Sequence, residues 1–292
     1  MEKTYKILVT GTSTGFGFLT AKTLADHGHT VFAGMRNVAS RNQNAANELI
    51  LYGKEAAGSI HSLEMDVSDD HSVNAAVQQM LEMGKQIDVV VNNAGLGCGG
   101  WLEGFTTEQF QKIFNVNLFG VQRVNRAVLP HMRARKSGLL VYVSSIIGRI
   151  IMPFTGPYIA SKFALEGLAE TYHCELSPLG IETAIVEPGA YATNFGANVL
   201  QTEDEEAISS YGELTDAPEK MWGGMMEQLE GENGPNPQDV ANAIAAIIKK
   251  PAGERPLRTV VDSLMGGCGV EKINDVCSEV QQQLMSTMAQ NS

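Results

Sequence analysis

Short runs of apolar, mostly β-branched residues recur along the first 190 residues and return once near the C-terminus. Each run is bounded by polar or glycine-containing segments, which is typical of a strand buried on both faces of a sheet. The predicted strands cover residues 7–9, 31–33, 60–65, 89–91, 139–143, 181–186 and 259–261.

Segments with helical periodicity lie between the earlier strands, at residues 18–27, 73–83, 110–132 and 163–176. Alternation of strand and helix indicates a parallel sheet, because parallel strands need crossover helices to return. The pattern therefore predicts a doubly wound α/β fold with seven parallel strands and helices on both faces.

Neither a proline- or serine-rich linker nor an internal repeat divides the chain, so we predict one domain over residues 1–292. Residues 196–237 form an expected insertion, and segments of this length in compact domains are typically lids or binding loops. Its apolar side chains include Tyr211, Met221, Trp222, Met225, Met226 and Leu229. Apolar spacings of three and four in residues 268–292 predict an extra C-terminal helix, docked on the body or on a second subunit.

Composition narrows the classes of function. The formal net charge of −12 argues against binding to a nucleic-acid backbone. The cysteines at 98, 174, 268 and 277 form no CxxC pair and have no nearby histidine at metal-ligand spacing, so we expect no zinc site and no disulfide framework. No stretch approaches the roughly 18 apolar residues of a membrane span, and the first residues lack a signal-peptide core. We therefore expect a cytoplasmic protein.

A glycine-rich turn, Thr10-Gly11-Thr12-Ser13-Thr14-Gly15-Phe16-Gly17, follows the first predicted strand. Glycines allow a tight turn and let backbone N–H groups approach a pyrophosphate, which the N-terminus of the following helix also attracts. The spacing alone is a weak signal, and its place between a strand and a helix indicates nucleotide binding. We expect contacts to the cofactor from Gly11, Ser13, Thr14, Gly15, Phe16 and Gly17.

The second strand ends in Gly34-Met35-Arg36-Asn37, where dinucleotide-binding folds usually place an acid that binds the adenosine ribose. Here Arg36 occupies this region and no carboxylate does. Charge-assisted hydrogen bonds from an arginine to a 2′-phosphate contribute about 1.5 to 3 kcal/mol. We therefore predict NADP rather than NAD as the cofactor.

Tyr158 and Lys162 are four residues apart, so on a helix they share a face. A tyrosine with its ordinary pKa of about 10 is a poor proton carrier at neutral pH. An ammonium group about 4 Å away, in a partly screened site, would lower that pKa by up to about three units. We expect Tyr158 to transfer the proton of the reaction and Lys162 to tune its pKa.

The chain resembles the short-chain dehydrogenases/reductases over roughly residues 5–195. The motifs that carry the likeness are Thr10 to Gly17, Asp66-Val67, Asn92-Asn93-Ala94-Gly95, Asn115-Val116-Asn117, Ser145, Tyr158 with Lys162, Glu187-Pro188-Gly189 and Thr193. The resemblance implies a Rossmann-type fold and hydride transfer between nicotinamide and a carbonyl or alcohol. Residues 141–195 look most like the 17β-hydroxysteroid and retinol dehydrogenases.

The resemblance also implies roles for the matching residues. Ser145, thirteen residues before Tyr158 as is usual in the family, would bind the substrate oxygen, with Ser144 as support. Asn117 would anchor a proton-relay water, and Lys162 with Tyr158 would contact the nicotinamide ribose. The other cofactor contacts would come from Asp66, Val67, Asn93, Ala94, Gly95, Pro188, Gly189 and Thr193.

The motifs place apolar side chains near the reaction centre, namely Cys98, Trp101, Ile146, Ile147, Pro153, Phe154, Tyr191 and Phe195, with Trp222 and methionines from the insertion. Phe16 and Tyr191 depart from the family pattern and would reshape this pocket. The set favours a hydrophobic ketone, aldehyde or secondary alcohol as substrate, and the alternative is that these side chains pack among themselves. We predict an NADP(H)-dependent oxidoreductase that interconverts such a carbonyl compound and its alcohol.

Two other functions stay open. A ketoacyl-thioester reductase would dock its carrier protein on Arg133, Arg135 and Lys136, although cations there also suit the C-terminus of a helix. A non-catalytic, NADP-binding redox sensor would commonly lose the tyrosine and lysine that this chain keeps. The resemblance further implies a homodimer or homotetramer, with helices 110–132 and 157–176 at the interface.

Overall fold

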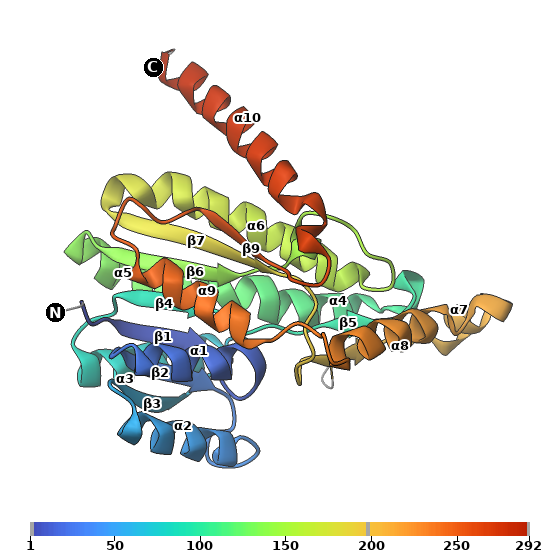
Figure 1. Cartoon of the computed structure of the whole chain (residues 1–292), viewed down its shortest axis with the longest axis horizontal. Helices are drawn as coiled ribbons and strands as arrows, with labels where there is room; N and C mark the ends of the chain where they lie inside the picture. The colour runs from blue at the N-terminus through green and yellow to red at the C-terminus, as the bar shows by residue number, and fades with distance from the viewer. Residues whose placement is uncertain (1–2, 197–198, 291–292) are drawn as a thin grey trace.

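The computed structural model describes residues 3–196 and 199–290. Its centre is a sheet of seven parallel strands in the order β3-β2-β1-β4-β6-β7-β9 (Figure 1). These strands are β1 (Lys6–Thr10), β2 (Thr30–Met35), β3 (Ser59–Glu64), β4 (Val89–Asn92), β6 (Gly138–Val143), β7 (Ile181–Pro188) and β9 (Arg258–Val261). The predicted doubly wound fold and its seven strands are confirmed.

Helices cover both faces of the sheet because alternate residues of a strand point to opposite sides. Ile7 and Val9 of β1 belong to the core shared with α1 (Gly15–Asp26), α2 (Gln43–Glu55) and α9 (Gln238–Lys249). Leu8, between them, belongs to the core shared with α3 (Asp70–Gly84), α5 (Gly120–Arg135) and α6 (Gly156–Leu176). Both faces are therefore buried, which explains the continuous apolar runs in the sequence.

The direction of sheet construction reverses between β1 and β4. The chain builds outward from β1 to β3 and then returns to place β4 on the other side of β1. At such a reversal the loops that follow the two strands diverge and leave a crevice at the carboxyl edge of the sheet. In open α/β sheets, ligands bind in such a crevice.

The helix expected over residues 110–132 is interrupted. α4 (Thr107–Phe114) runs into a π-helical turn at Asn115–Phe119 before α5 begins. Asn117 lies in this turn, where its side chain accepts a hydrogen bond from Leu96 N and donates to Leu96 O and to Ser161 Oγ. Single π turns of this kind are frequent at functional sites.

α5 ends at Arg135, with Arg133 and Arg135 in its last turn. Arg135 donates to the carbonyl of Ile87 and forms an ion pair with Asp88 at 2.6 Å. The interpretation of this basic group as cations at a helix C-terminus is supported. Arg135, one of the three cations on which a carrier protein would dock, is thus already paired within the chain.

The segment between β7 and α9 contains β8 (Leu200–Gln201), α7 (Glu205–Ser209) and α8 (Ala217–Glu230). β8 pairs with β5 (Cys98–Gly99), outside the main sheet. Trp101 stacks on Tyr211, with ring centroids 4.0 Å apart, and donates its indole N–H to Thr215 O. Residues 197–198 of the expected insertion lie outside the described part of the chain.

The expected C-terminal helix is present as α10 (Val270–Gln290), and it projects away from the body (Figure 1). Val270 and Asn274 are buried, whereas the apolar residues further along are exposed. Docking on the body is therefore wrong beyond the first turns, and docking on a second subunit stays a prediction. Residues 291–292 of the expected extension are not among the described residues. Within residues 3–196 and 199–290, no helix is long and apolar enough to cross a membrane.

Leu140 offers a test of the core assignment, because it is fully buried in the cluster between the sheet and α5 and α6. We expect Leu140→Ala to lower the free energy of unfolding by about 2 to 5 kcal/mol, through lost apolar burial and the cavity it leaves. Urea unfolding followed by circular dichroism measures this. Leu51→Ala, at an exposed position of α2, is the control and should stay within about 0.5 kcal/mol. Equal losses in the two variants would contradict the assignment.

Candidate active site

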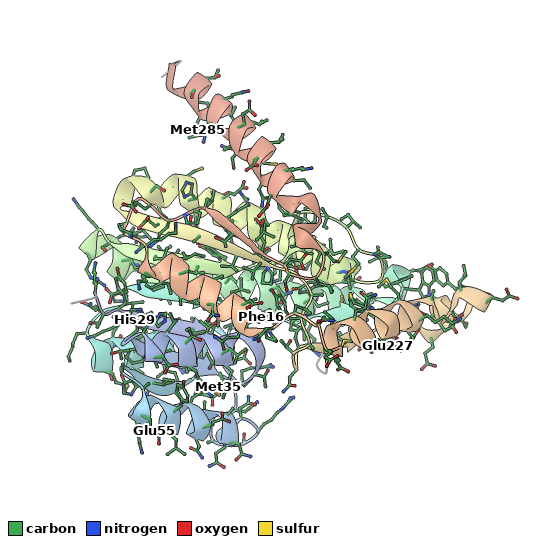
Figure 2. All side chains as sticks on the ribbon, in the orientation of Figure 1. Phe16, His29, Met35, Glu55, Glu227 and Met285 are labelled. Atoms are coloured by element: carbon green, nitrogen blue, oxygen red, sulfur yellow. The ribbon has the colours of Figure 1, made fainter. Side chains whose placement is uncertain are left out.

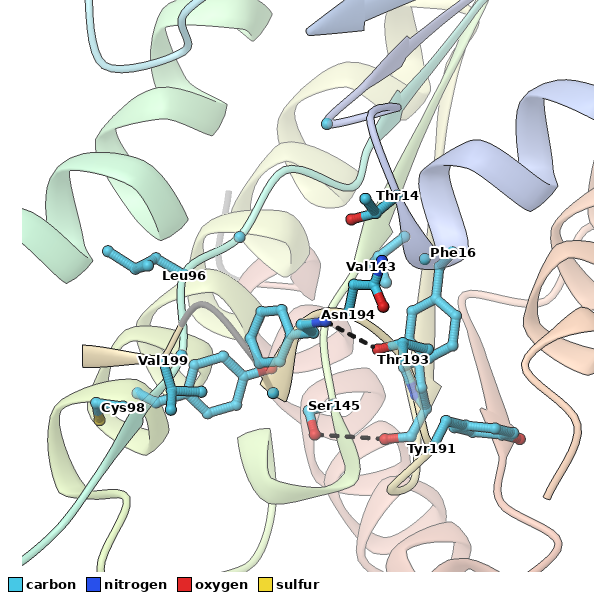
Figure 3. Close-up of a pocket in the computed structure, with 18 of the residues that line it drawn as sticks. Thr14, Phe16, Leu96, Cys98, Val143, Ser145, Tyr191, Thr193, Asn194 and Val199 are labelled. Atoms are coloured by element: carbon cyan, nitrogen blue, oxygen red, sulfur yellow. Dashed lines mark hydrogen bonds between the residues drawn. The ribbon is translucent and has the colours of Figure 1, made fainter. Parts of the chain in front are cut away.

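A cavity of about 630 Å³ runs along the carboxyl edge of the sheet. Its wall includes residues that follow six of the strands, namely Gly11, Arg36, Asp66, Asn93, Ser145 and Gly189. Segments distant in the sequence therefore meet because their strands end at one edge. Figure 3 shows part of this wall, with Thr14 and Phe16 at the start of α1 and with Ser145 near the segment that contains Tyr191 and Thr193.

The loop between β1 and α1 is held tightly against the sheet. Gly11 donates its backbone N–H to Gly34 O at 2.9 Å and adopts φ +71°, which favours glycine. A Cβ at Gly11 would lie 2.8 Å from the Cα of Ala94. At the start of α1, the side chain of Thr14 makes no cap hydrogen bond to the described backbone. The first-turn N–H groups thus lack the usual side-chain acceptor, which suits a helix terminus that binds an anion.

The cavity brings together all the expected site residues except Gly17 and Asn117. Those in its wall are Gly11, Ser13, Thr14, Gly15, Phe16, Arg36, Asp66, Val67, Asn93, Ala94, Gly95, Ser145, Tyr158, Lys162, Pro188, Gly189 and Thr193.

The two exceptions lie behind this wall. A Cβ at Gly17 would collide with Asn93 Nδ2 and Gly11 O, so this glycine lets the loop pack closely. Asn117 is buried and holds the backbone of Leu96. The cofactor contact expected of Gly17 is not supported by this position. Asn117 shapes the cavity from outside it, and its expected water-anchoring role stays a prediction.

Tyr158, Lys162 and Ser145 meet in the middle of the cavity. Tyr158 and Lys162 lie one turn apart on α6, and Lys162 Nζ is 5.5 Å from the centroid of the Tyr158 ring. Lys162 Nζ donates to Val143 O at 2.8 Å. Ser145 Oγ donates to Pro188 O at 3.3 Å and accepts a hydrogen bond from Ile147 N, which places it at the end of β6 (Figure 3).

Burial sets the proton affinities of these groups. It raises the pKa of Tyr158 well above its ordinary value, and a hydrogen bond with Ser145 only partly opposes this. It lowers the pKa of Lys162 to about 8, against the opposing influence of Glu166. The lowered pKa expected for Tyr158 is not found in this structure, because loss of hydration has the largest influence on its phenolate. Tyr158 is therefore protonated at neutral pH.

The two residues that depart from the family pattern contact each other. Phe16 and Tyr191 pack edge to face, with ring centroids 5.4 Å apart. The hydroxyl of Tyr191 donates to Val261 O at 3.1 Å, so the pair joins the glycine-rich loop to the edge of the sheet. Nearby, a Cβ at Gly15 would lie 3.6 Å from Thr193. The segment after β7 thus packs directly on the glycine-rich loop.

Two arginines stand at the end of the cavity near β2. Arg36 is mostly exposed, and its guanidinium lies 3.9 Å from the carboxylate of Asp66. Arg41 also lines this end and is absent from the residues expected from the sequence. The sequence could have indicated Arg41 only as a second arginine, five positions after Arg36. The folded loop after β2 is what brings the two side chains to one wall of the cavity.

The other end of the cavity is apolar. The expected residues found there are Cys98, Ile146, Ile147, Tyr191 and Phe195, and α8 adds Trp222, Met225, Met226 and Leu229. Trp101, Pro153 and Phe154 were expected with them but line a neighbouring groove of about 550 Å³. The reason is that Trp101 packs on Tyr211 and Phe154, and so joins the insertion to the body.

The family model for short chain dehydrogenases matches residues 5–204. The chain belongs to this family. A 3-ketodihydrosphingosine reductase from Bacteroides thetaiotaomicron is 35% identical over 89% of this chain and 88% of its own length. Human 17-beta-hydroxysteroid dehydrogenase type 1 is 33% identical over 84% of this chain and 74% of its own, which confirms the expected likeness to hydroxysteroid dehydrogenases.

The fold has a solved counterpart in an alcohol dehydrogenase from Thermococcus sibiricus, complexed with 5-hydroxy-NADP. Its TM-score is 0.71 at 26% identity, and the match covers 90% of this chain and 97% of the other. With the family membership, these likenesses establish a short-chain dehydrogenase that acts as an oxidoreductase on CH–OH groups.

Proposed function

We propose that this protein is an NADPH-dependent reductase of a hydrophobic ketone, with Tyr158 as its proton donor. One observation carries the proposal. A single cavity contains the glycine-rich loop with two arginines at one end, partly buried Tyr158 and buried Lys162 in the middle, and an apolar wall at the other end. The names of the two relatives, a ketone reductase and a hydroxysteroid dehydrogenase, support a hydrophobic carbonyl or alcohol as substrate.

The residues present fit a phosphorylated dinucleotide. The N-terminus of α1, where Thr14 leaves the first-turn N–H groups without a side-chain acceptor in the described structure, suits a pyrophosphate. Arg36 and Arg41 provide the two cations that a 2′-phosphate would attract. Lys162, in the wall beside Tyr158, would hold the nicotinamide ribose. When bound, NADPH supplies the hydride, and the chain supplies orientation and proton transfer.

Each catalytic side chain then has one task in the reduction. Ser145 Oγ donates a hydrogen bond to the carbonyl oxygen and fixes its position. Tyr158, which burial keeps protonated, donates its hydroxyl proton to that oxygen as negative charge develops there. The positive charge of Lys162 lies close enough to stabilise the phenolate that Tyr158 becomes.

Tyr158→Phe keeps the ring but removes the proton. We expect turnover to fall by about 100- to 10,000-fold, because the proton transfer loses its donor. NADPH absorbance measures turnover with a panel of 3-ketodihydrosphingosine, a steroid ketone and a short-chain ketone, and a fluorescence titration measures the Kd for NADPH, which should change little. Tyr52→Phe, whose hydroxyl binds Asp26 on the surface, is the control. Near wild-type turnover of Tyr158→Phe would refute the assignment, and tight NADPH binding without reduction of any ketone would refute the enzymatic function.

The coenzyme preference tests the two arginines. The double variant Arg36→Ala, Arg41→Ala should lose about 10- to 100-fold in kcat/KM with NADPH, because it removes charge-assisted hydrogen bonds to the 2′-phosphate, while NADH kinetics stay nearly constant. The double variant Arg133→Ala, Lys136→Ala, at the end of α5 and outside the cavity, removes the same number of positive charges and is the control. Equal losses with the two coenzymes would contradict NADP selectivity.

The indole N–H of Trp222 indicates a hydrogen-bond acceptor on the substrate. Trp222 lines the cavity, and its indole N–H is buried without a partner among the described residues. Buried donors are normally paired, so we expect the substrate to carry an acceptor oxygen away from its reacting carbonyl. Trp222→Phe should raise KM about 2- to 10-fold for a ketone with such an oxygen. A ketone of equal length without it should be unaffected, and Met225→Leu should not discriminate between them. An equal change for both ketones would count against this role.

A further inference from the structure

α10 carries a row of apolar side chains that this chain leaves uncovered. Val276, Val280 and Leu284 are 60%, 59% and 53% exposed, and Met288 is 59% exposed. The helix projects away from the body over this stretch, and Met285 marks its outer part (Figure 2). A contiguous apolar surface of this kind on an otherwise charged protein is typical of an interaction site.

The first turns fix the direction of the helix. Val270 is fully buried in a cluster with Ile146, Ile147 and Ile159. Asn274 donates a hydrogen bond of 2.6 Å to the buried carboxylate of Glu187 at the end of β7. α10 is therefore anchored at its base. Beyond Asn274, the apolar side chains that the structure describes stay exposed, so these turns gain little from packing on the body. Most helical stability in proteins comes from the packing of an apolar face.

Part of the apolar row fits a heptad repeat, the pattern by which helices pair along a narrow seam. Val280 and Leu284 stand at its inner positions, whereas Val276 and Met288 lie beside the seam. The a positions are Val270, Cys277 and Leu284, and the d positions are Ile273, Val280 and Thr287. The charged residues of α10 all fall at the outer b, c and f positions, and they are Glu271, Lys272, Asp275 and Glu279. The seam is thus free of charge along the roughly 24 Å that residues 273–288 span.

The residues beside the seam indicate what covers it. The e and g positions hold Asn274, Gln281, Met288, Val276, Gln283 and Gln290, none of them charged. Two identical helices can therefore meet without like charges in contact, in either orientation. A helix that selects a different protein usually carries charges at these positions to set its choice of partner. A lipid surface is disfavoured because the polar face has three acidic residues and one lysine, the reverse of a membrane-binding helix.

We propose that α10 is a self-association surface, on which the seam defined by Ile273, Cys277, Val280 and Leu284 packs against α10 of a second copy of this chain. The contact is isologous, since the same patch is used on both copies. It differs from the interface over helices 110–132 and 157–176 that the family resemblance implies. It does not depend on the proposed catalytic function, since the exposed turns of α10 lie outside the active-site cavity.

The test is the mass of the full chain in solution, measured by light scattering after size exclusion at micromolar concentration. The double variant Val280→Glu, Leu284→Glu places two charges in the seam. The control, Gln282→Glu with Ser286→Glu, adds the same charge at the outer f and c positions. We expect the wild type and the control to share one mass and the seam variant to have half of it. Circular dichroism and the Kd for NADPH, both unchanged, show that the seam variant is folded.

Several outcomes would overturn the proposal. These are a monomeric wild type, a seam variant with the wild-type mass, or a control that dissociates as the seam variant does. Sedimentation with phosphatidylcholine vesicles addresses the lipid alternative. Vesicle binding that the seam variant loses while its mass stays that of the wild type would make a membrane surface the occupant, and the proposal would fail.

Discussion

The geometry of the site depends on the hydrogen bonds that tie the end of β1 to the end of β4. Thr10 Oγ1 accepts from the backbone N–H groups of Asn93 and Ala94, both at 3.0 Å, and Asn93 Nδ2 donates to Thr10 O and Gly11 O. These bonds span the crevice where the strand order reverses. They hold the glycine-rich loop against the sheet with its backbone toward the cavity. Gly17 belongs to the same arrangement, because any side chain there would displace Asn93.

A second coupling joins the opposite walls of the cavity. Phe16 and Tyr191, the two departures from the family pattern, are accommodated as a pair because each ring fills the space beside the other. Replacing one of them alone would leave a gap or a clash at the boundary between the loop and the segment after β7. That segment leads into the insertion whose helix α8 supplies Trp222 and the methionines. The shape of the glycine-rich loop and the position of the insertion are thus linked.

A buried cluster of charged side chains, Glu166, Glu187 and Arg258, lies at the end of β7 beside the active site. Glu187 directly precedes Pro188, whose carbonyl accepts the hydrogen bond of Ser145. Burial and the nearby Glu166 raise the pKa of Glu187 to about 8, although Arg258 lies 3.4 Å from its carboxylate. Its hydrogen bond to Asn274 joins the base of α10 to the strand that carries Pro188. Buried charges of this kind are costly unless every member is paired, so the cluster constrains how β7, β9 and α10 fit together.

Sequence patterns were sufficient to predict the strands, the glycine-rich loop and the shared helix face of Tyr158 and Lys162. Each of these is a local pattern, written in residues that are neighbours on one element. The helix α2 was missed because its larger apolar residues, Leu49 to Tyr52, are consecutive and so hide the spacing of three and four that marks a helix. Which distant residues meet became visible only in the folded chain. In the folded chain, the helix predicted over residues 110–132 is interrupted at Asn117. Arg41 lines the active-site cavity, and Trp101 lines the neighbouring groove.

The proton affinity of Tyr158 shows the same division between local pattern and tertiary environment. The spacing of four residues correctly predicted that the ammonium group of Lys162 lies near the ring of Tyr158. The loss of hydration that dominates the pKa of Tyr158 comes from the surrounding elements, which no local sequence pattern reveals. The C-terminal helix was likewise predicted from periodicity, yet only the folded body shows that its apolar row is left exposed. Periodicity specifies which residues of a helix share a face, and the contacts of the complete chain decide whether that face is covered.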